Sequence, residues 1–211
     1  MTYLSIPAES FLLLTADSGR QHHTQFRKYA LIGAALIELA LRERITLNDD
    51  KNPRVTVTDP TPTGDPVLDQ ALEALGRRDG KRLHGAFSAR GMDLTEVTGQ
   101  QLVQAGVLEQ KKGLFGTTWP ARDPGPENAL RARLSGALDG SVSPSEQDVV
   151  LLVLMKAARV GYVVIEKDVP GMKRSEVLAR IDELGEASPH RGITKGVTCA
   201  IDAMVAAISA G

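Results

Sequence analysis

The sequence contains little cysteine and few aromatic residues. Its 211 residues include one cysteine, Cys199, which excludes an intrachain disulfide; in the apolar pattern "GVTCAIDAMVAAI" we expect it to be a small buried hydrophobe. Only 4% of the residues are aromatic, whereas 42% are hydrophobic, so aliphatic side chains and alanine must fill the core. Such packing suits closely spaced helices, and we therefore expect a mainly α-helical protein in which residues 1–211 form one domain.

Neither an excess of one charge nor a long hydrophobic run is present. A net charge of −1 and a pI of about 6.4 exert no overall attraction on nucleic acid or on an anionic membrane, so any such attraction must be local. The apolar run "FLLLTA" is far too short to span a bilayer, and the N-terminus lacks the basic opening and cleavage site of a secretory signal. We expect a soluble cytoplasmic protein whose membrane contacts are peripheral.

Motifs that would identify an enzyme or a metal site are also missing. The sequence has no phosphate-binding glycine loop, no nucleophile elbow and no paired-cysteine motif. The four histidines, which are His22, His23, His84 and His190, do not form a cluster with metal-ligand spacing. We therefore predict a non-enzymatic protein that holds no metal and no cofactor.

Helix and hairpin signals cover most of the chain. Caps, first-turn prolines and apolar periodicity predict a first helix that begins at Ser5. The same signals predict further helices over 24–44, 65–77, 80–89, 94–104, 124–140, 143–160, 174–185 and 194–210. Alternating residues around "NDDKNP" predict a first β-hairpin over 44–60. A second hairpin is predicted after "VL", with the charged turn "EQKKG" and the return strand "LFGTTW".

The second hairpin has the most distinctive local composition. Its basic residues Lys111 and Lys112 stand beside three large apolar ones, Leu114, Phe115 and Trp119, the last being the only tryptophan of the chain. Basic residues that flank exposed apolar ones are typical of an interfacial membrane anchor. In the alternative interpretation, Phe115 and Trp119 fold back onto the body of the protein as part of its core.

Two basic clusters offer a local attraction for anions. One surrounds "FRKYA" and the other lies in "GKRLHGAFSAR", and they comprise Arg20, Arg27, Lys28, Lys81, Arg82 and Arg90. Surface solvation explains such charges, but an anion-binding patch would use the same residues. Phosphate is the natural ligand of such a patch because arginine presents a planar fork of donors to it.

Two stretches separated by the first hairpin, "LIELALRERI" (36–45) and "PTGDPVLDQALEAL" (62–75), resemble the signature of the Golgi phosphoprotein 3 family. The start "SIPAESFLLL" and the stretch "QQLVQAGVLEQKKGLFGTTWP" also match, so the resemblance covers nearly the whole chain. It implies a mainly α single domain, with a helical core surrounded by amphipathic helices and with short β-hairpins. Eukaryotic relatives are non-enzymatic adaptors that bind phosphatidylinositol 4-phosphate, insert an apolar hairpin into the bilayer and link glycosyltransferase tails to coatomer. The inserting hairpin corresponds to the one around Leu114 and Phe115.

The sequence departs from this family at the positions that bind the lipid head group. The family's tryptophan and its three arginines fall on His23, Ile32, Met92 and Thr95. These residues lack the stacking surface or the positive charge that a phosphorylated inositol requires. Arg27 and Arg90 lie close to the lost positions in sequence, so we predict a head-group site formed by His23, Arg27 and Arg90. The abundance of alanine and arginine, together with the short N-terminus, indicates a bacterial member.

Three classes of partner follow from these patterns. We predict an anionic phospholipid or membrane surface as the main partner. Alternatively, the hairpin mediates oligomerisation or the binding of a protein, which would make the chain a protein-interaction module. A winged-helix-like nucleic-acid binder is disfavoured, since the presumed recognition helix "LTEVTGQQLVQ" contains neither arginine nor lysine. We expect no nucleic-acid partner.

Overall fold

The structure is a computed structural model that describes residues 4–16, 18–21, 24–48, 53–114 and 116–209. The described chain is mainly α-helical with two small antiparallel hairpins, which confirms the predicted fold class. The elements are α1 (Ile6–Leu13), α2 (Thr24–Leu41), β1 (Ile45–Leu47), β2 (Val55–Val57), α3 (Pro66–Gly76), η1 (Leu83–Ser88), α4 (Thr95–Gln104), β3 (Lys111–Gly113), β4 (Gly116–Thr118), α5 (Gly125–Asp139), α6 (Glu146–Ala157), α7 (Arg174–Ala187) and α8 (Arg191–Ser209).

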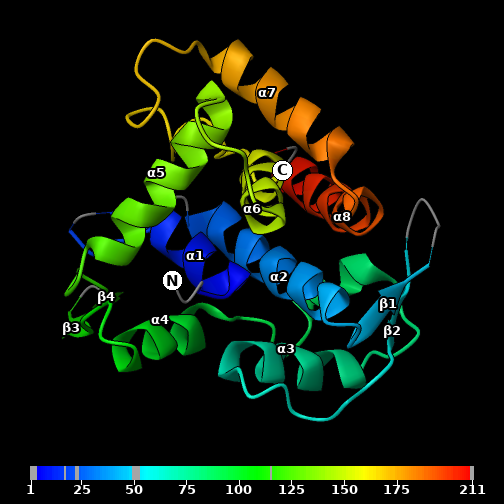
Figure 1. Ribbon diagram of the computed structural model, residues 1–211. Helices are drawn as coiled ribbons and strands as arrows, with labels where there is room; N and C mark the ends of the chain where they lie inside the picture. The colour runs from blue at the N-terminus through cyan, green and yellow to red at the C-terminus, as the bar shows by residue number, and fades with distance from the viewer. Residues whose placement is uncertain (1–3, 17, 22–23, 49–52, 115, 210–211) are drawn as a thin grey trace.

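Helices α1 and α2 lie at the centre of the molecule. In Figure 1 they are drawn in blue, with α3 and α4 on one side and α5 to α8 on the other. Every residue of α1 is buried, and α2 contacts α1, α3, α6 and α8. Gly33 of α2 permits this close packing, because a Cβ atom there would lie 2.6 Å from Ile201 Cδ1 and 2.8 Å from Leu154 Cδ1.

Local sequence signals explain where several helices begin and end. Ser145 caps α6, where its side chain accepts a hydrogen bond from the Asp148 backbone N–H while the Asp148 carboxylate accepts one from the Ser145 backbone N–H. At the C-terminal end of α5, Gly140 takes a left-handed conformation with φ 81°, which glycine adopts without steric cost. The segment predicted as a short helix over 80–89 forms a 3-10 helix, η1, instead of an α-helix.

The second hairpin differs from its prediction in register. Lys111 pairs with Thr118, Lys112 with Thr117 and Gly113 with Gly116, so the two lysines belong to a strand and not to a charged turn. Glycine at position 116 accounts for the shift, since its φ of 114° is a conformation that favours glycine and closes the hairpin there. Leu114 consequently follows the end of β3, at the tip of the hairpin.

Cys199 is exposed, and the prediction that it is a buried hydrophobe is wrong. Along α8 the buried positions are Thr194, Val197, Ala200, Ile201 and Val205, which recur every three or four residues. Cys199 falls on the opposite side of the helix from this stripe. The apolar letters around it reflect the amphipathic character of α8, in which an alanine, Ala203, also occupies the outer face.

Candidate functional site

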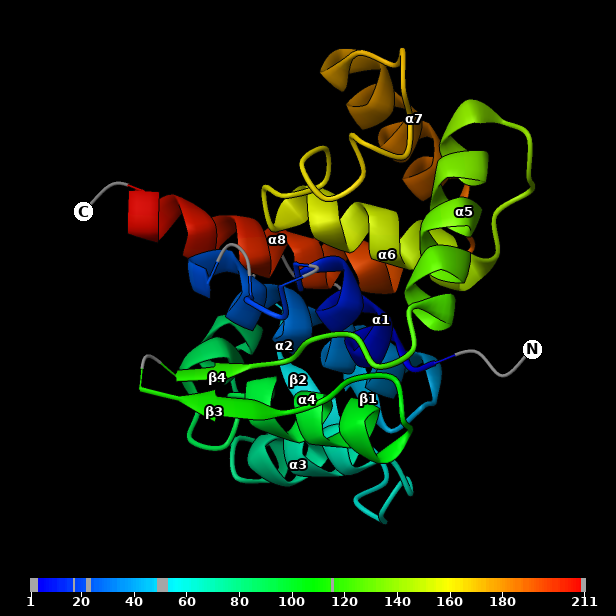
Figure 2. The ribbon, with the colours of Figure 1, turned by 90° about the vertical axis from the view of Figure 1, so that its left-hand side faces the viewer.

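A basic cleft lies between the start of α2, the start of α4 and the second hairpin. Its volume is about 770 Å³. Figure 2 shows the hairpin formed by β3 and β4 running across the front of α4. Among the residues that the structure describes, four cations and a single carboxylate line the cleft: Arg20, Arg27, Lys111, Lys112 and Glu96. Although the whole chain is close to neutral, this surface is strongly cationic and attracts anions locally. The sequence alone did not give the position of such a surface.

Arg27 is the least exposed cation of this cleft. Its guanidinium is half-buried, and its Nε atom has no hydrogen-bond partner within the described chain. Burial lowers the pKa of Arg27, while the nearby carboxylate of Asp93 opposes that shift. An arginine stays charged despite such a shift, so Arg27 places a partly desolvated positive charge at the cleft. A phosphate oxygen is the type of group that satisfies it.

The two lysines of β3 are exposed at the other side of the cleft. The Nζ atom of Lys111 lies 3.7 Å from a carboxylate oxygen of Glu109, an exposed pair of the kind that contributes little to stability. Gln110 ties the base of the hairpin to α4, since its Nε2 donates to Glu96 Oε1 over 2.8 Å. The hairpin is therefore held beside α4 at its base, while its lysines remain accessible to an anion.

Leu114 is the exposed apolar residue of the hairpin. Its side chain is 100% exposed, although a large aliphatic side chain gains free energy when it leaves water. Phe115, the second apolar residue predicted at this tip, lies outside the described residues. The structure thus gives the hairpin tip one fully solvated leucine beside two lysines.

Trp119 is buried, and its prediction as an exposed membrane-contact residue is wrong. It is 2% exposed and meets Phe11 of α1 edge to face, with ring centroids 5.9 Å apart and an interplanar angle of 83°. Its backbone N–H donates to the Gly19 carbonyl over 2.7 Å. Gly99 of α4 makes room for the indole, because a Cβ atom there would lie 2.5 Å from the ring. The tryptophan joins the base of the hairpin to α1 and α4.

The remaining predicted head-group residues are distributed unevenly. Arg27 lines the cleft, His23 lies outside the described residues, and Arg90 is exposed but does not line the cleft. The Arg90 carbonyl instead accepts a hydrogen bond of 3.2 Å from Arg77 Nη2. Sequence reasoning noticed Arg20 only as a neighbour of the basic cluster and missed Glu96. Its place shortly before the basic "FRKYA" segment was the available signal for Arg20.

The positions that correspond to the family's head-group residues separate in the same way. Ile32 and Met92 are fully buried in the core, so neither can contact a ligand. Thr95, at the first position of α4, lines the cleft and contributes a hydroxyl there. In this chain, positive charge reaches the same region from Arg20, Arg27 and the hairpin lysines.

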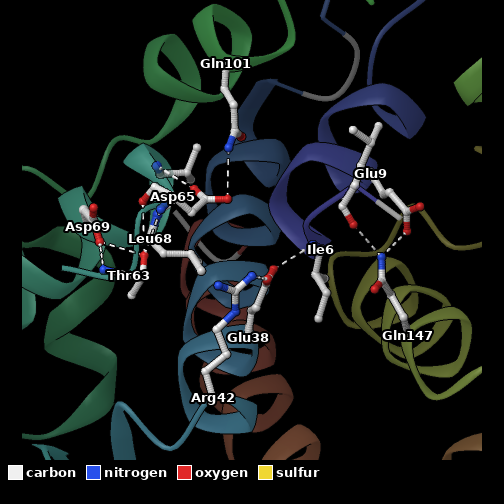
Figure 3. Close-up of polar contacts among 12 residues, drawn as sticks. Ile6, Glu9, Glu38, Arg42, Thr63, Asp65, Leu68, Asp69, Gln101 and Gln147 are labelled. Carbon is white, nitrogen blue, oxygen red and sulfur yellow. Dashed lines mark hydrogen bonds and ion pairs between the residues drawn. The ribbon is translucent and has the colours of Figure 1, made fainter. Parts of the chain in front are cut away.

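The first signature stretch contains a structural carboxylate. Glu38 of α2 accepts a hydrogen bond of 2.7 Å from the backbone N–H of Ile6, the first residue of α1, and it also pairs with Arg42 (Figure 3). Ser5 makes no side-chain cap at this helix start, so Glu38 satisfies the N–H in its place. Burial raises the pKa of Glu38, and its hydrogen bond to Ile6 and the charge of Arg42 oppose this effect.

The second signature stretch contains a helix cap that is shared with a neighbouring helix. Asp65 Oδ1 accepts from the backbone N–H groups of Val67 and Leu68, at 2.8 Å and 3.2 Å, and Asp65 Oδ2 accepts from Gln101 Nε2 of α4 at 2.9 Å (Figure 3). Asp69 holds the preceding loop by accepting from Thr63. The acidic residues of the signature therefore stabilise the fold that positions α4.

Replacing Asp65 by alanine should lower the free energy of unfolding by about 1–2 kcal/mol, because the cap of α3 and the bond to α4 are lost together. Asp65→Asn should cost much less, since an amide oxygen caps a helix equally well and the Gln101 amide can turn its oxygen toward the new donor. Urea unfolding of both variants measures the difference. Equal losses in the two variants would contradict a capping role.

The described helices and side chains set two further limits. None of the helices in the described ranges combines the length and the apolar character that crossing a bilayer requires. Among the same residues, His, Cys, Asp and Glu side chains do not gather in groups of three or more that could hold a metal ion.

The described chain is thus a mainly helical protein with a cationic cleft beside a β-hairpin. The model of the family described as Golgi phosphoprotein 3 (GPP34) matches residues 6–204, nearly the whole chain. The chain therefore belongs to the Golgi phosphoprotein 3 family, as the two signature stretches predicted. A comparison with curated proteins gives no significant match.

Proposed function

We propose that this protein is a non-enzymatic peripheral membrane adaptor that binds anionic phospholipid head groups in the basic cleft while the hairpin tip contacts the bilayer. The observation that supports it best is the position of a fully exposed leucine beside a cleft lined by four cations and one carboxylate. Membership of the Golgi phosphoprotein 3 family supports an adaptor role at a cytoplasmic membrane surface.

The chemistry of the cleft suits a phosphate group attached to a membrane. Arg27 offers a half-buried guanidinium, where a charge-assisted hydrogen bond is stronger than in bulk water. Arg20, Lys111 and Lys112 surround the approach and add charge. We propose these four cations as the head-group contacts; Arg90 does not line this cleft, and His23 stays a prediction.

The expected affinity for a membrane is modest. Full burial of a leucine side chain contributes about 1.5–3 kcal/mol, and each lysine near an anionic surface adds about 1 kcal/mol. These contributions support reversible association, which head-group recognition or several copies of the protein must strengthen. Such a protein binds and leaves a membrane readily, as an adaptor needs to do.

Leu114→Ser should weaken binding to vesicles that contain an anionic phospholipid by about tenfold, because even partial insertion of the leucine contributes about 1.4 kcal/mol. Flotation of the protein with vesicles of increasing anionic content measures this change. Binding should also fall as salt is raised from 0.05 to 0.5 M, since salt screens the cationic cleft.

Val142→Ser is the matched control, since Val142 is another exposed large hydrophobic residue and lies on the α5–α6 connection. It should leave flotation unchanged. Failure of the wild-type protein to float at low salt would overturn the proposal, as would equal effects of the two serine substitutions.

The exposure of Leu114 also favours a second candidate function, a protein-interaction module in which the hairpin tip binds a second copy or a protein partner. Light scattering of the wild-type protein and of Leu114→Ser discriminates between the two for a second copy. A wild-type oligomer that the substitution converts to monomers, together with absent flotation, would support the interaction module.

A further inference from the structure

A second cleft lies on the other side of the molecule, among α6, α7, α8 and the irregular segment 158–173. This α6–α8 cleft has a volume of about 440 Å³, which falls within the range of small-molecule sites. Figure 2 shows the segment that joins α6 to α7, in yellow and gold, lying over α6. The α6–α8 cleft shares no lining residue with the basic cleft beside the hairpin.

Charged side chains of both signs line this cleft, with one more cation than carboxylates. The cations are Lys156, Arg159 and Arg174, and the carboxylates are Asp182 and Asp202. Lys156 forms an ion pair with Asp182. The Nε atom of Arg159 lies 3.8 Å from Oδ1 of Asp202, which is too long for a hydrogen bond. The surplus of one positive charge matches a ligand with a single anionic group.

Two of these cations have donors to spare. Neither the guanidinium of Arg159 nor that of Arg174 donates a hydrogen bond in the described part of the chain, and Arg174 forms no ion pair there. An exposed pair as loose as Arg159 and Asp202 contributes little to stability, so a ligand anion can take the guanidinium at small cost. Two guanidinium groups that converge on one cleft provide the planar, multidentate donors that suit phosphate.

The backbone of Arg159 takes a conformation that is costly for a residue other than glycine. Arg159 has a φ of 63°, a left-handed conformation that favours glycine. It follows the C-terminus of α6, where its N–H donates to the Lys156 carbonyl and the Val160 N–H donates to the Met155 carbonyl. This is the Schellman arrangement, in which glycine is the usual residue at the position of Arg159. Strain at such a position points toward a binding role.

Apolar and aromatic groups complete the lining. Val153, Leu178 and the half-exposed Val163 contribute apolar surface, and the ring of Tyr162 lies among them. Gly161 keeps this wall close to α6, because a Cβ atom there would lie 2.9 Å from Lys156 Cα. A ligand that combines an anionic group with an apolar or aromatic body would contact both the guanidinium groups and this wall.

We propose that the α6–α8 cleft is a second binding site, which takes a small soluble organic phosphate with an aromatic or apolar body. Arg159 and Arg174 would bind the phosphate oxygens, and Tyr162 with the apolar wall would contact the body of the ligand. This site is independent of the membrane function proposed above, since it lies on separate helices and needs no bilayer.

The test is an NMR titration of the uniformly 15N-labelled full chain with phenyl phosphate, with inorganic phosphate and phenol as separate probes. Phenyl phosphate should shift the amide signals of Gly161 and Thr198 in a saturable manner, and it should bind at least tenfold more tightly than either fragment. Shifts confined to Arg27, Lys111 and Lys112 would overturn the proposal, as would the absence of saturable shifts at millimolar concentration.

Arg159→Gly separates a binding role from a structural one. Because glycine favours the conformation of residue 159, this variant should keep or raise the melting temperature while it weakens phenyl phosphate binding about tenfold or more. Glu43→Gly is the matched control, since Glu43 has a φ of 57° after the end of α2 and does not line the cleft. It should bind as the wild type does, and Arg174→Gln should weaken binding as Arg159→Gly does. Unchanged affinity in both arginine variants would refute the site.

Discussion

Replacing Trp119 by alanine is expected to lower the free energy of unfolding by about 3–5 kcal/mol and the melting temperature by about 10 °C. The side chain is 2% exposed and packs against Phe11 and Gly99, so its loss leaves a cavity where α1, α4 and the hairpin meet. Neighbouring backbone cannot collapse into this space easily, because Gly19 already packs against the Trp119 and Pro120 backbone. Thermal unfolding followed by circular dichroism measures the shift.

Leu114→Ala provides the comparison within the same hairpin. Leu114 is fully exposed, and its truncation should change stability by no more than about 0.5 kcal/mol. The order of the two effects should be reversed in vesicle flotation, which Leu114→Ala should weaken more than Trp119→Ala. A Trp119→Ala protein that melts with the wild type would show that the tryptophan is not the packing residue described above.

The helices were predictable because their signals are local. A serine before an acidic turn, prolines in a first turn and a glycine after the last turn fix the ends of α5 and α6 through groups within a few residues of each other. Apolar periodicity then places the buried face. The same reasoning misjudged Cys199, because it took the apolar letters around this residue as a sign of burial, whereas α8 is amphipathic and Cys199 falls on its outer face.

The candidate site was harder to predict because it depends on which side chains distant segments bring together. Arg27 and Arg90 both lie near lost family positions in sequence, but only Arg27 reaches the cleft. Trp119 belongs to a hairpin with the composition of a membrane anchor, yet its side chain is buried against a glycine in α4 and a phenylalanine in α1. Neither partner is adjacent to the hairpin in sequence, so no local pattern distinguishes the buried tryptophan from the exposed leucine.

Arg133→Met is expected to cost about 3–5 kcal/mol at pH 7, because it leaves two buried carboxylates without their shared cation. The guanidinium lies 3.1 Å from Glu9 and 2.9 Å from Asp148, whose side chains are only 3% and 5% exposed. Although burial lowers the pKa of Arg133, these carboxylates raise it above its ordinary value. Urea unfolding at pH 7 measures the loss.

Arg131→Met is the matched control on the same helix. Arg131 pairs with Glu127 and Asp168, whose side chains remain partly exposed and can be solvated when the arginine is lost. Its replacement should therefore cost about 1–2 kcal/mol. Comparable losses in both variants would indicate that arginine packing, and not the burial of unpaired carboxylates, determines the effect.

The pH dependence of Arg133→Met follows from the titration of Glu9. Burial raises the pKa of Glu9 above its ordinary value of 4.5, and a hydrogen bond from Gln147 and the charge of Arg133 oppose that shift. A carboxyl whose pKa is higher in the folded state binds its proton more tightly there, so its contribution to stability falls as pH rises from about 4.5 through the folded value. Removal of Arg133 raises the folded pKa further and extends this loss to higher pH.

The deficit of Arg133→Met relative to the wild type should therefore be smaller at pH 5 than at pH 7. Adding Glu9→Gln to the variant should restore part of the lost stability at pH 7. A neutral amide occupies the same place without burying a charge, and it does not bind or release a proton. The combined variant should also lose most of the pH dependence that Arg133→Met adds. A deficit that stays constant between pH 5 and pH 7 would mean that the cation stabilises the fold through packing and hydrogen bonds alone.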